Sequence, residues 1–407
     1  MSFPPVEEQL EILRRGTVEI IPEEELVKKL EQSRKENRPL RIKLGCDPTR
    51  PDLHLGHSVI LRKLRQFQDL GHHAILIIGD FTARIGDPSG QNTTRPSLTP
   101  EEISENAQSY LDQAGKVLNL ETLEIVWNSK WLGEMNFGDV IRLSSSLTVA
   151  RMIERDDFSR RFENNEPISL HEFLYPLAQG QDSVHLESDV ELGGTDQKFN
   201  LLVGRQLQQQ AEQDPQVCLM MPLLVGTDGS RKMSKSYDNY IGIDESANDM
   251  YGKTLRIPDS MIYTWFELLT DNGGDQLEEI RSRSETDPRN TKHDLAYSLT
   301  SLYHGEAKAK EARTHFEQTV IRKEVPEDAT TLEFEPDSRH RLLDIISNAG
   351  LTSSNGETKR LIKQGGISID EKKISDKEHE LVFESGAEYH LRVGKRKFAI
   401  LKSADGK

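Results

Sequence analysis

Two histidines separated by two residues are the first side chains in this sequence whose spacing indicates chemistry. His54-Leu55-Gly56-His57 begins a segment, residues 55–70, whose apolar positions recur at helical spacing. The first turn of a helix attracts phosphate, because its backbone N–H groups are free and its dipole is positive there. Two imidazoles at this place can add donors to a phosphate whose charge grows during a reaction. Gly56 leaves the helix surface bare enough for a flat adenine ring.

A second group of this kind is Lys232-Met233-Ser234-Lys235-Ser236, which lies in a segment rich in glycine and serine. Two ammonium groups on a mobile loop are suited to clamping a diphosphate leaving group. The chain has neither the G-x-x-x-x-G-K-[ST] nor the G-x-G-x-x-G pattern, which argues against kinase-like and dinucleotide-binding sites. Taken singly, the two motifs also fit surface histidines without a role and a solvated basic loop. As zinc ligands, the histidines lack the nearby glutamate of zinc proteases.

The elements that must position these groups alternate between strands and helices. Leu40, Ile42 and Leu44 alternate with polar residues as in a strand, and residues 74–78 form an apolar run typical of a buried parallel strand. With the helical segment between them they predict a βαβ unit and an open α/β sheet. A capping box at Thr99-Pro100-Glu101-Glu102 predicts a helix to about residue 117. Further strands are expected at 190–194 and 217–225, a helix from Thr195, and a loop at 226–239.

Composition limits the class of protein. The chain has 407 residues and a formal net charge of −16, and its longest apolar runs fall far short of the ~20 residues that span a bilayer. Cys46 and Cys218 are too few for a disulfide framework or a four-cysteine zinc site, so we expect two core thiols. The acidic N-terminus does not resemble a signal or transit peptide. These features predict a soluble cytoplasmic enzyme without membrane contact.

The charge is unevenly distributed along the chain. Residues 338–407 carry 14 Lys and Arg against 10 Asp and Glu, whereas the preceding residues have a net charge of −20. An acidic body with a basic tail permits one module that docks on nucleic acid. An ordinary solvated surface explains the charge of the tail equally well.

The two motifs and their order resemble the paired sequence motifs of class I aminoacyl-tRNA synthetases. Three further segments are similar to those of the bacterial tyrosyl enzymes of that family: Leu44-Gly45-Cys46-Asp47-Pro48-Thr49, Ile85-Gly86-Asp87-Pro88-Ser89-Gly90 and Gly193-Gly194-Thr195-Asp196-Gln197. The resemblance covers nearly the whole chain. It implies a doubly wound, Rossmann-like parallel-sheet catalytic domain over residues 1–239, a helical domain over 240–324, a linker over 325–337 and a small α+β RNA-binding domain over 338–407.

The resemblance also implies a two-step reaction. The carboxylate of L-tyrosine attacks the α-phosphate of ATP, which is accompanied by Mg²⁺, and the tyrosyl group then moves from the adenylate to the 3′ end of tRNA(Tyr). No protein nucleophile and no protein-bound metal are needed, so catalysis rests on positioning and charge stabilisation. The residues expected to face the phosphates and pyrophosphate are His54, His57, Thr49, Lys232 and Lys235. Those expected to hold the rest of the nucleotide are Asp47, Gly56, Gly194, Asp196, Met233 and Ser234.

The amino-acid pocket is predicted from a helical stripe. Tyr175, Gln179 and Asp182 are spaced i, i+4 and i+7, and three polar groups on one stripe need polar partners that a bound ligand can supply. A solvent-facing stripe is the alternative. The resemblance assigns Tyr175 and Gln179, with Gln197 and either Asp87 or Asp80, to the substrate ammonium group, and Asp182 to the phenolic O–H.

Two positions depart from the best-known tyrosyl enzymes. Gln181 stands where many of them have tyrosine, and at ~100° per residue it should point away from the pocket. Lys43 stands where some relatives have tyrosine, and it could donate to the phenolic oxygen.

The tail resembles the small RNA-binding domain first known from ribosomal protein S-four. The resemblance rests on residues 353–362 and on strands expected at 366–370 and 388–401, which include Lys395, Arg396 and Lys397. It implies RNA contacts by Lys359, Arg360 and Lys363. Family likeness further implies a homodimer.

Two other functions remain open from the sequence. A tryptophanyl enzyme would share both phosphate-handling motifs but would not need the stripe of Tyr175, Gln179 and Asp182. An RNA-binding relative without catalysis would tolerate loss of the histidines and lysines, all of which are present. Tyrosine-dependent ATP–pyrophosphate exchange separates the three.

Overall fold

The computed structural model describes residues 3–49, 51–88, 99–322, 329–370, 372–394 and 397–404. It divides into two compact units, Met1–Tyr303 and His304–Lys407, which are taken separately below. Four residues of the motifs quoted above, Ser89, Gly90, Lys395 and Arg396, lie outside the described residues.

The first unit is built on a six-stranded sheet with the order β1-β6-β5-β2-β3-β4. Five strands are parallel and β1 is an antiparallel edge strand paired with β6. The strands are β1 (Glu19–Ile21), β2 (Arg41–Cys46), β3 (His73–Ile78), β4 (Glu124–Trp127), β5 (Val190–Gly194) and β6 (Val217–Met221). The order reverses between β2 and β5, as in a doubly wound fold, and this confirms the predicted class. In such sheets ligands bind outside the carboxyl ends of the strands at the reversal.

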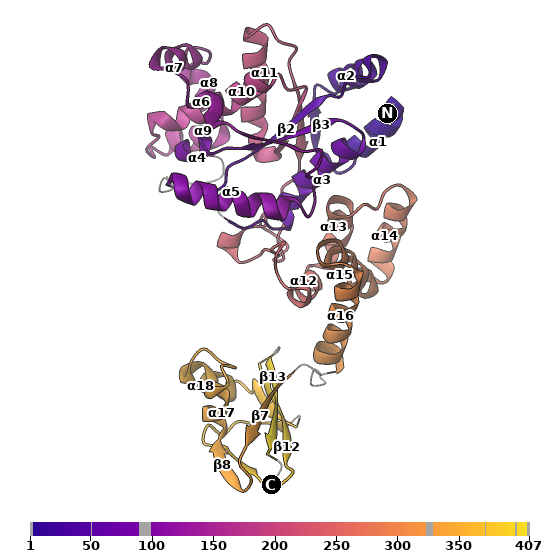
Figure 1. The fold of residues 1–407 in the computed structure, drawn as a ribbon, viewed down its shortest axis with the longest axis vertical. Helices are drawn as coiled ribbons and strands as arrows, with labels where there is room; N and C mark the ends of the chain where they lie inside the picture. The colour runs from indigo at the N-terminus through magenta and orange to yellow at the C-terminus, as the bar shows by residue number, and fades with distance from the viewer. Residues whose placement is uncertain are drawn as a thin grey trace. The chain divides into compact units, whose positions relative to one another are not determined.

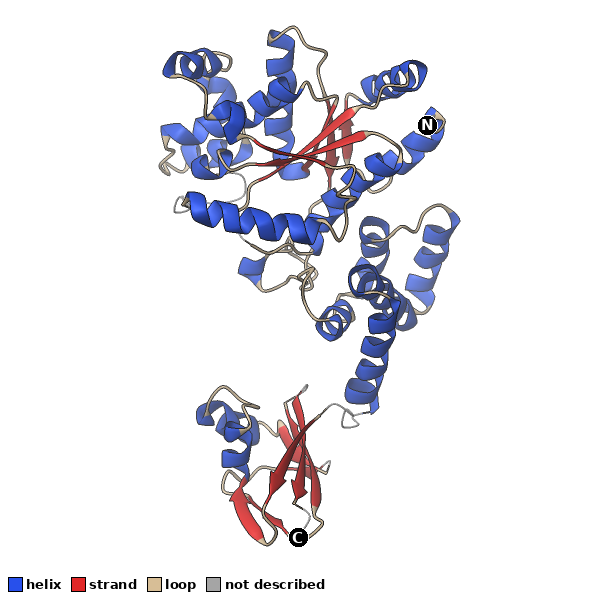
Figure 2. Cartoon of the chain, in the orientation of Figure 1, coloured by secondary structure: helices blue, strands red, loops and turns tan. Residues whose placement is uncertain are grey.

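Helices cover both faces of this sheet (Figures 1 and 2). They are α1 (Val6–Arg14), α2 (Glu23–Glu36), α3 (Leu55–Asp69), α4 (Thr82–Ile85), α5 (Pro100–Ala114), α6 (Ser129–Leu132), α7 (Phe137–Ser144), α8 (Val149–Ile153), α9 (Asp156–Glu163), α10 (Leu174–Leu186) and α11 (Lys198–Gln210). Short 3₁₀ helices lie at η1 (Leu170–Phe173), η2 (Thr195–Gln197) and η3 (Lys235–Tyr237).

Alternation along the strands decides which helix each side chain meets. Ile42 and Leu44 of β2 pack in the main core with Leu55 and Val59 of α3. Lys43, the residue between them, bonds instead to the main chain of α10 at Gln179. Successive residues of β2 therefore face opposite layers, as the pleat requires. This places the helix of the two histidines on one face of the sheet and the polar stripe on the other.

The predicted boundaries agree closely with the observed ones around the site. α3 begins at Leu55 after the cap His54, and α5 begins at Pro100 with the capping box of Thr99 and Glu102 formed. The helix predicted from Thr195 begins as the 3₁₀ turn η2. The last strand is shorter than predicted, because β6 ends at Met221 and Pro222, which has no N–H to donate, follows it.

The remainder of the first unit is helical. It contains α12 (Ala247–Thr254), η4 (Asp259–Met261), α13 (Ile262–Leu269), α14 (Asp275–Thr286) and α15 (Pro288–His304). Trp265 and Leu295 of these helices belong to the same hydrophobic cluster as α3. The helical segment is therefore packed against the catalytic sheet layer, although its division at residues 239 and 240 remains a prediction.

The second unit begins with α16 (Glu306–Phe316) and a π-helical turn, η5 (Glu317–Arg322). Its sheets contain β7 (Thr330–Phe334), β8 (Ser338–Arg341), β9 (Ile367–Ile369), β10 (Lys372–Lys373), β11 (Glu380–Phe383), β12 (Glu388–Val393) and β13 (Lys397–Ser403). Its helices α17 (Leu342–Asn348) and α18 (Asn355–Lys363) share a core with those strands.

One element of this unit lies where a linker was expected. Residues 330–334 form β7, which pairs in parallel with β13. The threonines and alternating apolar residues of this segment favour a strand, a signal that the flanking acidic residues and prolines obscured. None of the helices among the described residues is long and apolar enough to cross a membrane.

Candidate active site

His54 and His57 cap the first turn of α3 and have fixed tautomers. Nδ1 of His54 accepts the backbone N–H of Gly56 at 3.1 Å, and Nδ1 of His57 accepts the backbone N–H of His54 at 3.2 Å. A neutral imidazole has one acceptor and one donor nitrogen, so the proton of each ring is on Nε2. Both rings therefore offer an Nε2–H donor, whereas the backbone N–H groups of Leu55, Gly56 and His57 at this helix end already have partners within the protein.

Burial keeps both rings neutral. It lowers the pKa of His54 to about 2, with a further contribution from His57, and lowers the pKa of His57 to about 4. The ring centroids are 3.9 Å apart. Gly56 lies tightly between the His54 ring and Met233, since a Cβ here would come within 2.9 Å of the ring. Any larger residue would displace the cap.

The lysine loop is joined to the same helix end. Met233 is buried, and its N–H bonds to the carbonyl of Leu224 at 2.7 Å. Lys232 lies 3.9 Å from the Asp196 carboxylate, and Lys235 forms an ion pair with Asp52. Both lysines thus have anionic partners of the protein itself at the positions where phosphate charge is expected.

Asn239 holds the backbone of this loop. Its Oδ1 accepts the N–H of Ser234 at 2.8 Å, and its Nδ2 donates to the carbonyl of Lys232 at 3.1 Å and to Asp228 at 3.1 Å. The side chain is buried, so these bonds are shielded from water.

A cavity of about 360 Å³ lies at the carboxyl ends of β2 and β5, where the strand order reverses. Ten of the predicted residues line it: Asp47, Thr49, His57, Asp87, Tyr175, Gln179, Asp182, Gly194, Asp196 and Gln197. Residues of the nucleotide motifs and of the polar stripe of α10 therefore line one cavity.

The Asp182 carboxylate lines this cavity and is 3% exposed. Its Oδ1 accepts the indole N–H of Trp131 at 2.8 Å, and its Oδ2 accepts an N–H of Asn128 at 3.3 Å. Burial raises the pKa of Asp182 to about 7, whereas the charge of Lys43 and these two hydrogen bonds act to lower it. The Trp131 ring is itself stacked on His185, with centroids 4.3 Å apart. An acceptor fixed in this way is suited to a ligand O–H.

Asp87 also lines the cavity, among several polar groups. It accepts the Gln197 amide at 2.8 Å and the Arg155 guanidinium at 3.1 Å. The Tyr175 hydroxyl donates to Asp47 at 3.0 Å. Burial raises the pKa of Asp47 to about 7, while hydrogen bonds from Thr82 and Tyr175 act to lower it and the charge of Asp87 acts to raise it. The carboxylates of Asp87 and Asp47 and the hydroxyl of Tyr175 are acceptors that suit an ammonium group.

Asp80, the alternative to Asp87 as a partner of the substrate ammonium group, caps a helix instead. Its carboxylate accepts the backbone N–H of Ser129 at the beginning of α6, at 2.9 Å, and it does not line the cavity. The geometry therefore favours Asp87 of the two.

Lys43 also lies outside the cavity wall. Its Nζ is 3.1 Å from Glu191 and donates to the carbonyl of Gln179 at 3.2 Å. Gln181 does not line the cavity. His54, Gly56 and the loop residues 232–235 likewise lie beside the cavity rather than in its wall.

Several residues of the site were missed from the sequence. Trp131 and Asn128 come from a segment that carries no motif, and Arg155, Glu191 and Asn239 are isolated polar residues. Only Glu191 carried a signal in the sequence, because a glutamate within the apolar strand β5 indicates a buried charge that needs partners. Cys218 is buried as expected. Cys46 lines the cavity and is only partly buried as a residue. Its thiol group is shielded from water, and this raises the pKa of the thiol to about 12.

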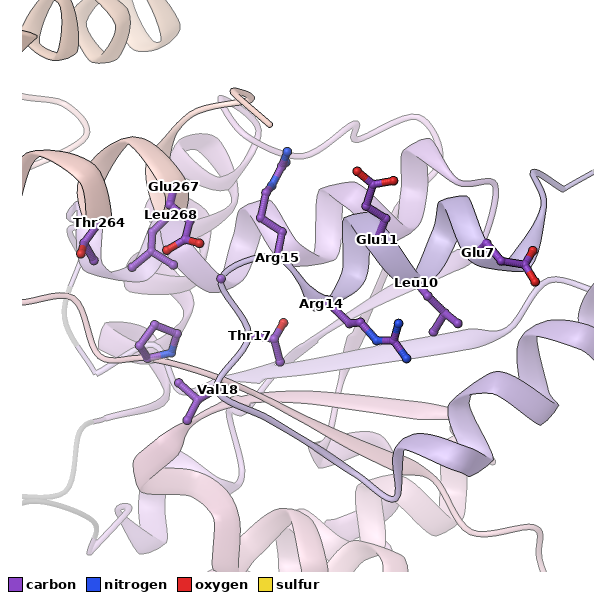
Figure 3. Close-up of a pocket in the computed structure, with 12 residues that line it drawn as sticks. Glu7, Leu10, Glu11, Arg14, Arg15, Thr17, Val18, Thr264, Glu267 and Leu268 are labelled. Atoms are coloured by element: carbon purple, nitrogen blue, oxygen red, sulfur yellow. The ribbon is translucent and has the colours of Figure 1, made fainter. Parts of the chain in front are cut away.

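A larger groove of about 730 Å³ lies elsewhere in this unit, between α1, the turn that follows it and α13 (Figure 3). None of the predicted site residues lines it. Arg14, Arg15, Glu7, Glu11 and Glu267 give it mixed charge, without the convergent polar groups of the smaller cavity. Among the described residues, no group of three or more His, Cys, Asp or Glu side chains could hold a metal ion.

The family follows from comparison with known proteins. Residues 35–320 match the sequence model of the family described as tRNA synthetases class I (W and Y). The chain belongs to this family. Synthetases of this group include a curated relative from Salinibacter ruber, named tyrosine–tRNA ligase, which is 55% identical over 99% of the chain and 98% of its own length. Another of that name, from Thermotoga maritima, is 50% identical over 98% of the chain and 99% of its own length.

Solved structures of the group share the fold. A tyrosyl-tRNA synthetase from Archaeoglobus fulgidus, described as complexed with L-tyrosine, has a TM-score of 0.62 and 23% identity, and covers 76% of the chain and 100% of that protein. A truncated mitochondrial tyrosyl-tRNA synthetase from Aspergillus nidulans also has a TM-score of 0.62, with 22% identity over 77% of the chain and 93% of that protein.

Proposed function

We propose that the cavity between α3 and α10 carries out tyrosine–tRNA ligation, the activity for which the curated relatives are named. The chain activates L-tyrosine with ATP and transfers the tyrosyl group to tRNA(Tyr). The observation that carries the assignment is that Asp182, a fixed buried acceptor, lies in the same cavity as His57 and Asp196. That cavity offers a phenol acceptor at one end and phosphate and ribose partners at the other.

In the first step a tyrosine carboxylate oxygen forms a bond to the α-phosphorus of ATP, and the bond to the bridging oxygen of pyrophosphate breaks. No protein atom becomes covalently attached. The Nε2–H groups of His54 and His57 donate to the phosphate as charge grows on it, together with Thr49. Lys232 and Lys235 balance the charge of the departing pyrophosphate, and Mg²⁺ carried by ATP shares it.

The nucleotide and the amino acid are held by different groups. Asp196 and Gly194 hold the ribose, Gly56 and Met233 lie under the adenine, and Ser234 orders the loop. Asp87, Gln197, Tyr175 and Gln179 surround the ammonium group of tyrosine, and Asp47 fixes Tyr175. Asp182 accepts the phenolic O–H. In the second step a terminal ribose hydroxyl of the tRNA attacks the tyrosyl carbonyl carbon, and AMP leaves.

The basic tail contacts the tRNA. Lys359, Arg360 and Lys363 of α18 have exposed side chains, and Thr358 and Ile362 of the same helix are buried in the core of the unit. A helix with one buried face and three exposed cations is suited to following a phosphate backbone. The cytoplasm, where ATP and tRNA are present, is the proposed location.

A second copy of the chain is the proposed partner of an apolar surface. Large exposed apolar side chains lie on α7, α8, α9 and η1, and both α7 and η1 pack against α10. Phe137 is 79% exposed and Leu170 is 84% exposed. Exposed apolar groups in this number mark interaction sites, and a homodimer would cover them. Light scattering tests this, since Leu170→Glu should lower the measured mass to that of one chain.

The activity itself is tested by ATP–pyrophosphate exchange. The chain should exchange label only when L-tyrosine is present, and L-tryptophan should not replace it. Exchange with tryptophan alone would assign the chain to the other branch of the family. Absence of exchange with either amino acid would support an RNA-binding protein without catalysis.

A further inference from the structure

Glu191 is an unusual residue for the middle of the catalytic sheet. It lies in β5 between Val190 and Leu192, in a strand of the parallel sheet where apolar residues are the rule. Its side chain is only 2% exposed. A buried carboxylate is strongly destabilising unless protein groups replace the water that it loses. The partners of Glu191 therefore indicate what this residue does.

One oxygen of the carboxylate meets Gln179, which lines the cavity, and Lys43, which lies behind its wall. Lys43 is its neighbour in register on β2, and its Nζ is 3.1 Å from Oε1. The amide Nε2 of Gln179, on α10, donates to the same oxygen at 3.0 Å. Glu191 thus links Lys43 of β2 to Gln179 of α10, the helix that also carries Asp182.

The other oxygen is anchored to the scaffold. Oε2 accepts from Ser183 Oγ at 3.3 Å and from the Gln216 amide. Gly204 of α11 makes the room for this cluster, since a Cβ there would lie 2.6 Å from Ser183 Oγ and 2.7 Å from the Gln216 amide nitrogen. The carboxylate is therefore held in one position from behind, by groups that no ligand in the cavity touches.

This anchoring decides which way the Gln179 amide points. An ionised carboxylate only accepts hydrogen bonds, so the amide must turn its Nε2 toward Glu191. Its Oε1 then faces the other way, where it accepts an N–H of Asn200 at 3.1 Å. An amide oxygen, and not an amide N–H, is what an ammonium group requires. With a neutral amide in place of Glu191, Gln179 could turn over and present donors to the substrate.

Glu191 also holds the charge of Lys43. The Lys43 ammonium is buried, and Asp182 is the pocket carboxylate on which its charge acts. Without Glu191 that ammonium would lose its counterion and would turn to Asp182. Asp182 would then be occupied by a cation rather than by the phenolic O–H of a ligand.

We propose that Glu191 is a positioning residue for both ends of the tyrosine pocket, orienting the Gln179 amide and keeping Lys43 away from Asp182. The inference rests on the proposed function, because it concerns recognition of tyrosine in this cavity. Its role is distinct from that of the residues that touch the substrate.

The test is tyrosine activation by Glu191→Gln, measured by ATP–pyrophosphate exchange with tyrosine and with phenylalanine. The KM for tyrosine should rise at least ~10-fold and the KM for ATP should change less than ~2-fold, because only the amino-acid end loses its fixed partners. The ratio of kcat/KM for tyrosine to that for phenylalanine should fall at least ~10-fold. Glu191→Asp, which keeps the charge, should recover part of both losses.

The matched control is Asp189→Asn, two residues earlier. Asp189 is buried and lies 3.6 Å from Lys29 and 3.4 Å from Arg38, but does not line the cavity. Its loss should lower the melting temperature and leave both KM values and the tyrosine/phenylalanine ratio unchanged. Equal kinetic shifts in the two variants would reduce the role of Glu191 to stability and overturn the proposal.

A second variant covers the case in which Glu191→Gln does not fold. Lys43→Gln/Glu191→Gln removes both charges together and leaves two amides that can pair. It should still raise the KM for tyrosine, because the Gln179 amide has lost its acceptor-only partner. An unchanged KM for tyrosine and an unchanged ratio in either folded variant would contradict the inference. Failure of the proposed function would instead be seen as absence of tyrosine-dependent exchange in the unaltered chain.

Discussion

The indole N–H of Trp131 donates to Oδ1 of Asp182 at 2.8 Å, and this bond fixes the carboxylate in the wall of the cavity. Asn128 donates to the other oxygen at 3.3 Å. Neither donor lies on the helix that carries Asp182. The direction of the acceptor is therefore set by α6 and its cap Asn128, which pack against α10, and a ligand O–H has to approach along the direction that these two bonds leave open.

Replacing Asp182 with Ala should severely reduce tyrosine activation and shrink the tyrosine/phenylalanine ratio. An apolar pocket separates ligands that differ by one small group by only about 1–3 kcal/mol. A buried acceptor facing a bare phenyl ring adds the cost of an unmet hydrogen bond. Exchange kinetics with both amino acids measure the ratio. Gln181→Ala is the control and should alter the ratio much less; loss of discrimination in that variant, or its full retention in Asp182→Ala, would refute the stripe assignment.

Replacing Lys235 with Ala should slow adenylate formation about 100-fold while tyrosine binding stays nearly the same, since the charge of pyrophosphate develops mainly in the transition state. Single-turnover kinetics and tyrosine titration separate the two quantities. Lys28, which is exposed on α2, provides the control Lys28→Ala, expected to behave as the unaltered chain. An exchange rate that does not change in Lys235→Ala would exclude the role.

Replacing His54 or His57 with Ala should slow adenylate formation. The activation barrier should rise by about 2–4 kcal/mol, which is the effect of losing one preorganised donor. Each change also removes a helix cap, which costs about 1 kcal/mol of stability. Circular dichroism confirms that the variant is folded before its kinetics are measured. A metal ion found bound at these two residues would contradict the assignment.

Burial of the His54 ring makes stability depend on pH. The folded pKa is about 2 and the ordinary value is 6.5, so below pH 6.5 the unfolded chain binds a proton that the folded chain does not. Stability is therefore lost as the pH falls, by up to about 1.4 kcal/mol per pH unit for this one group. Urea unfolding at pH 7, 6 and 5 should show a smaller loss in His54→Ala than in the unaltered chain. An equal loss of stability with falling pH in the two proteins would mean that the His54 ring becomes protonated in the folded state.

A chain that ends at residue 324 should still form tyrosyl-adenylate, because every residue of the cavity precedes Asn239. It should charge tRNA poorly, since the cations of α18 are absent.

In the full chain, replacing Lys359, Arg360 and Lys363 with Ala should reduce the slope of log affinity against log salt by about 2. Equal charging by the truncated and full chains at moderate salt would contradict the RNA-binding assignment.

Much of the site was predictable because its motifs lie at the ends of regular elements. His54 and His57 at a helix start, and Tyr175, Gln179 and Asp182 on one helical stripe, follow from local spacing alone. The partners of these residues do not. Trp131 meets Asp182 only through the packing of α6 against α10, and nothing in its neighbourhood along the chain indicates this contact.

The secondary structure likewise contains elements that local sequence patterns predict and elements that they do not. Four of the five parallel strands follow from apolar patterns, whereas the parallel strand β4 and several short strands, among them β1 and β7, were not predicted. β1 pairs with β6, which lies about two hundred residues further along the chain, with Glu19 opposite Met220. β7 depends on pairing with β13. Such pairings are decided by long-range packing, which short segments of sequence do not encode.

The ion pair between Lys232 and Asp196 means that an arriving nucleotide exchanges partners rather than filling an unoccupied place. Lys232 lies 3.9 Å from the carboxylate proposed to hold the ribose, so a nucleotide bound in the proposed way would replace this contact. ATP would bring both replacements at once, a hydroxyl donor for Asp196 and a phosphate for Lys232. In this binding mode the ribose would release Lys232 for the phosphates, and a ligand with only one of these two groups would leave the exchange half complete.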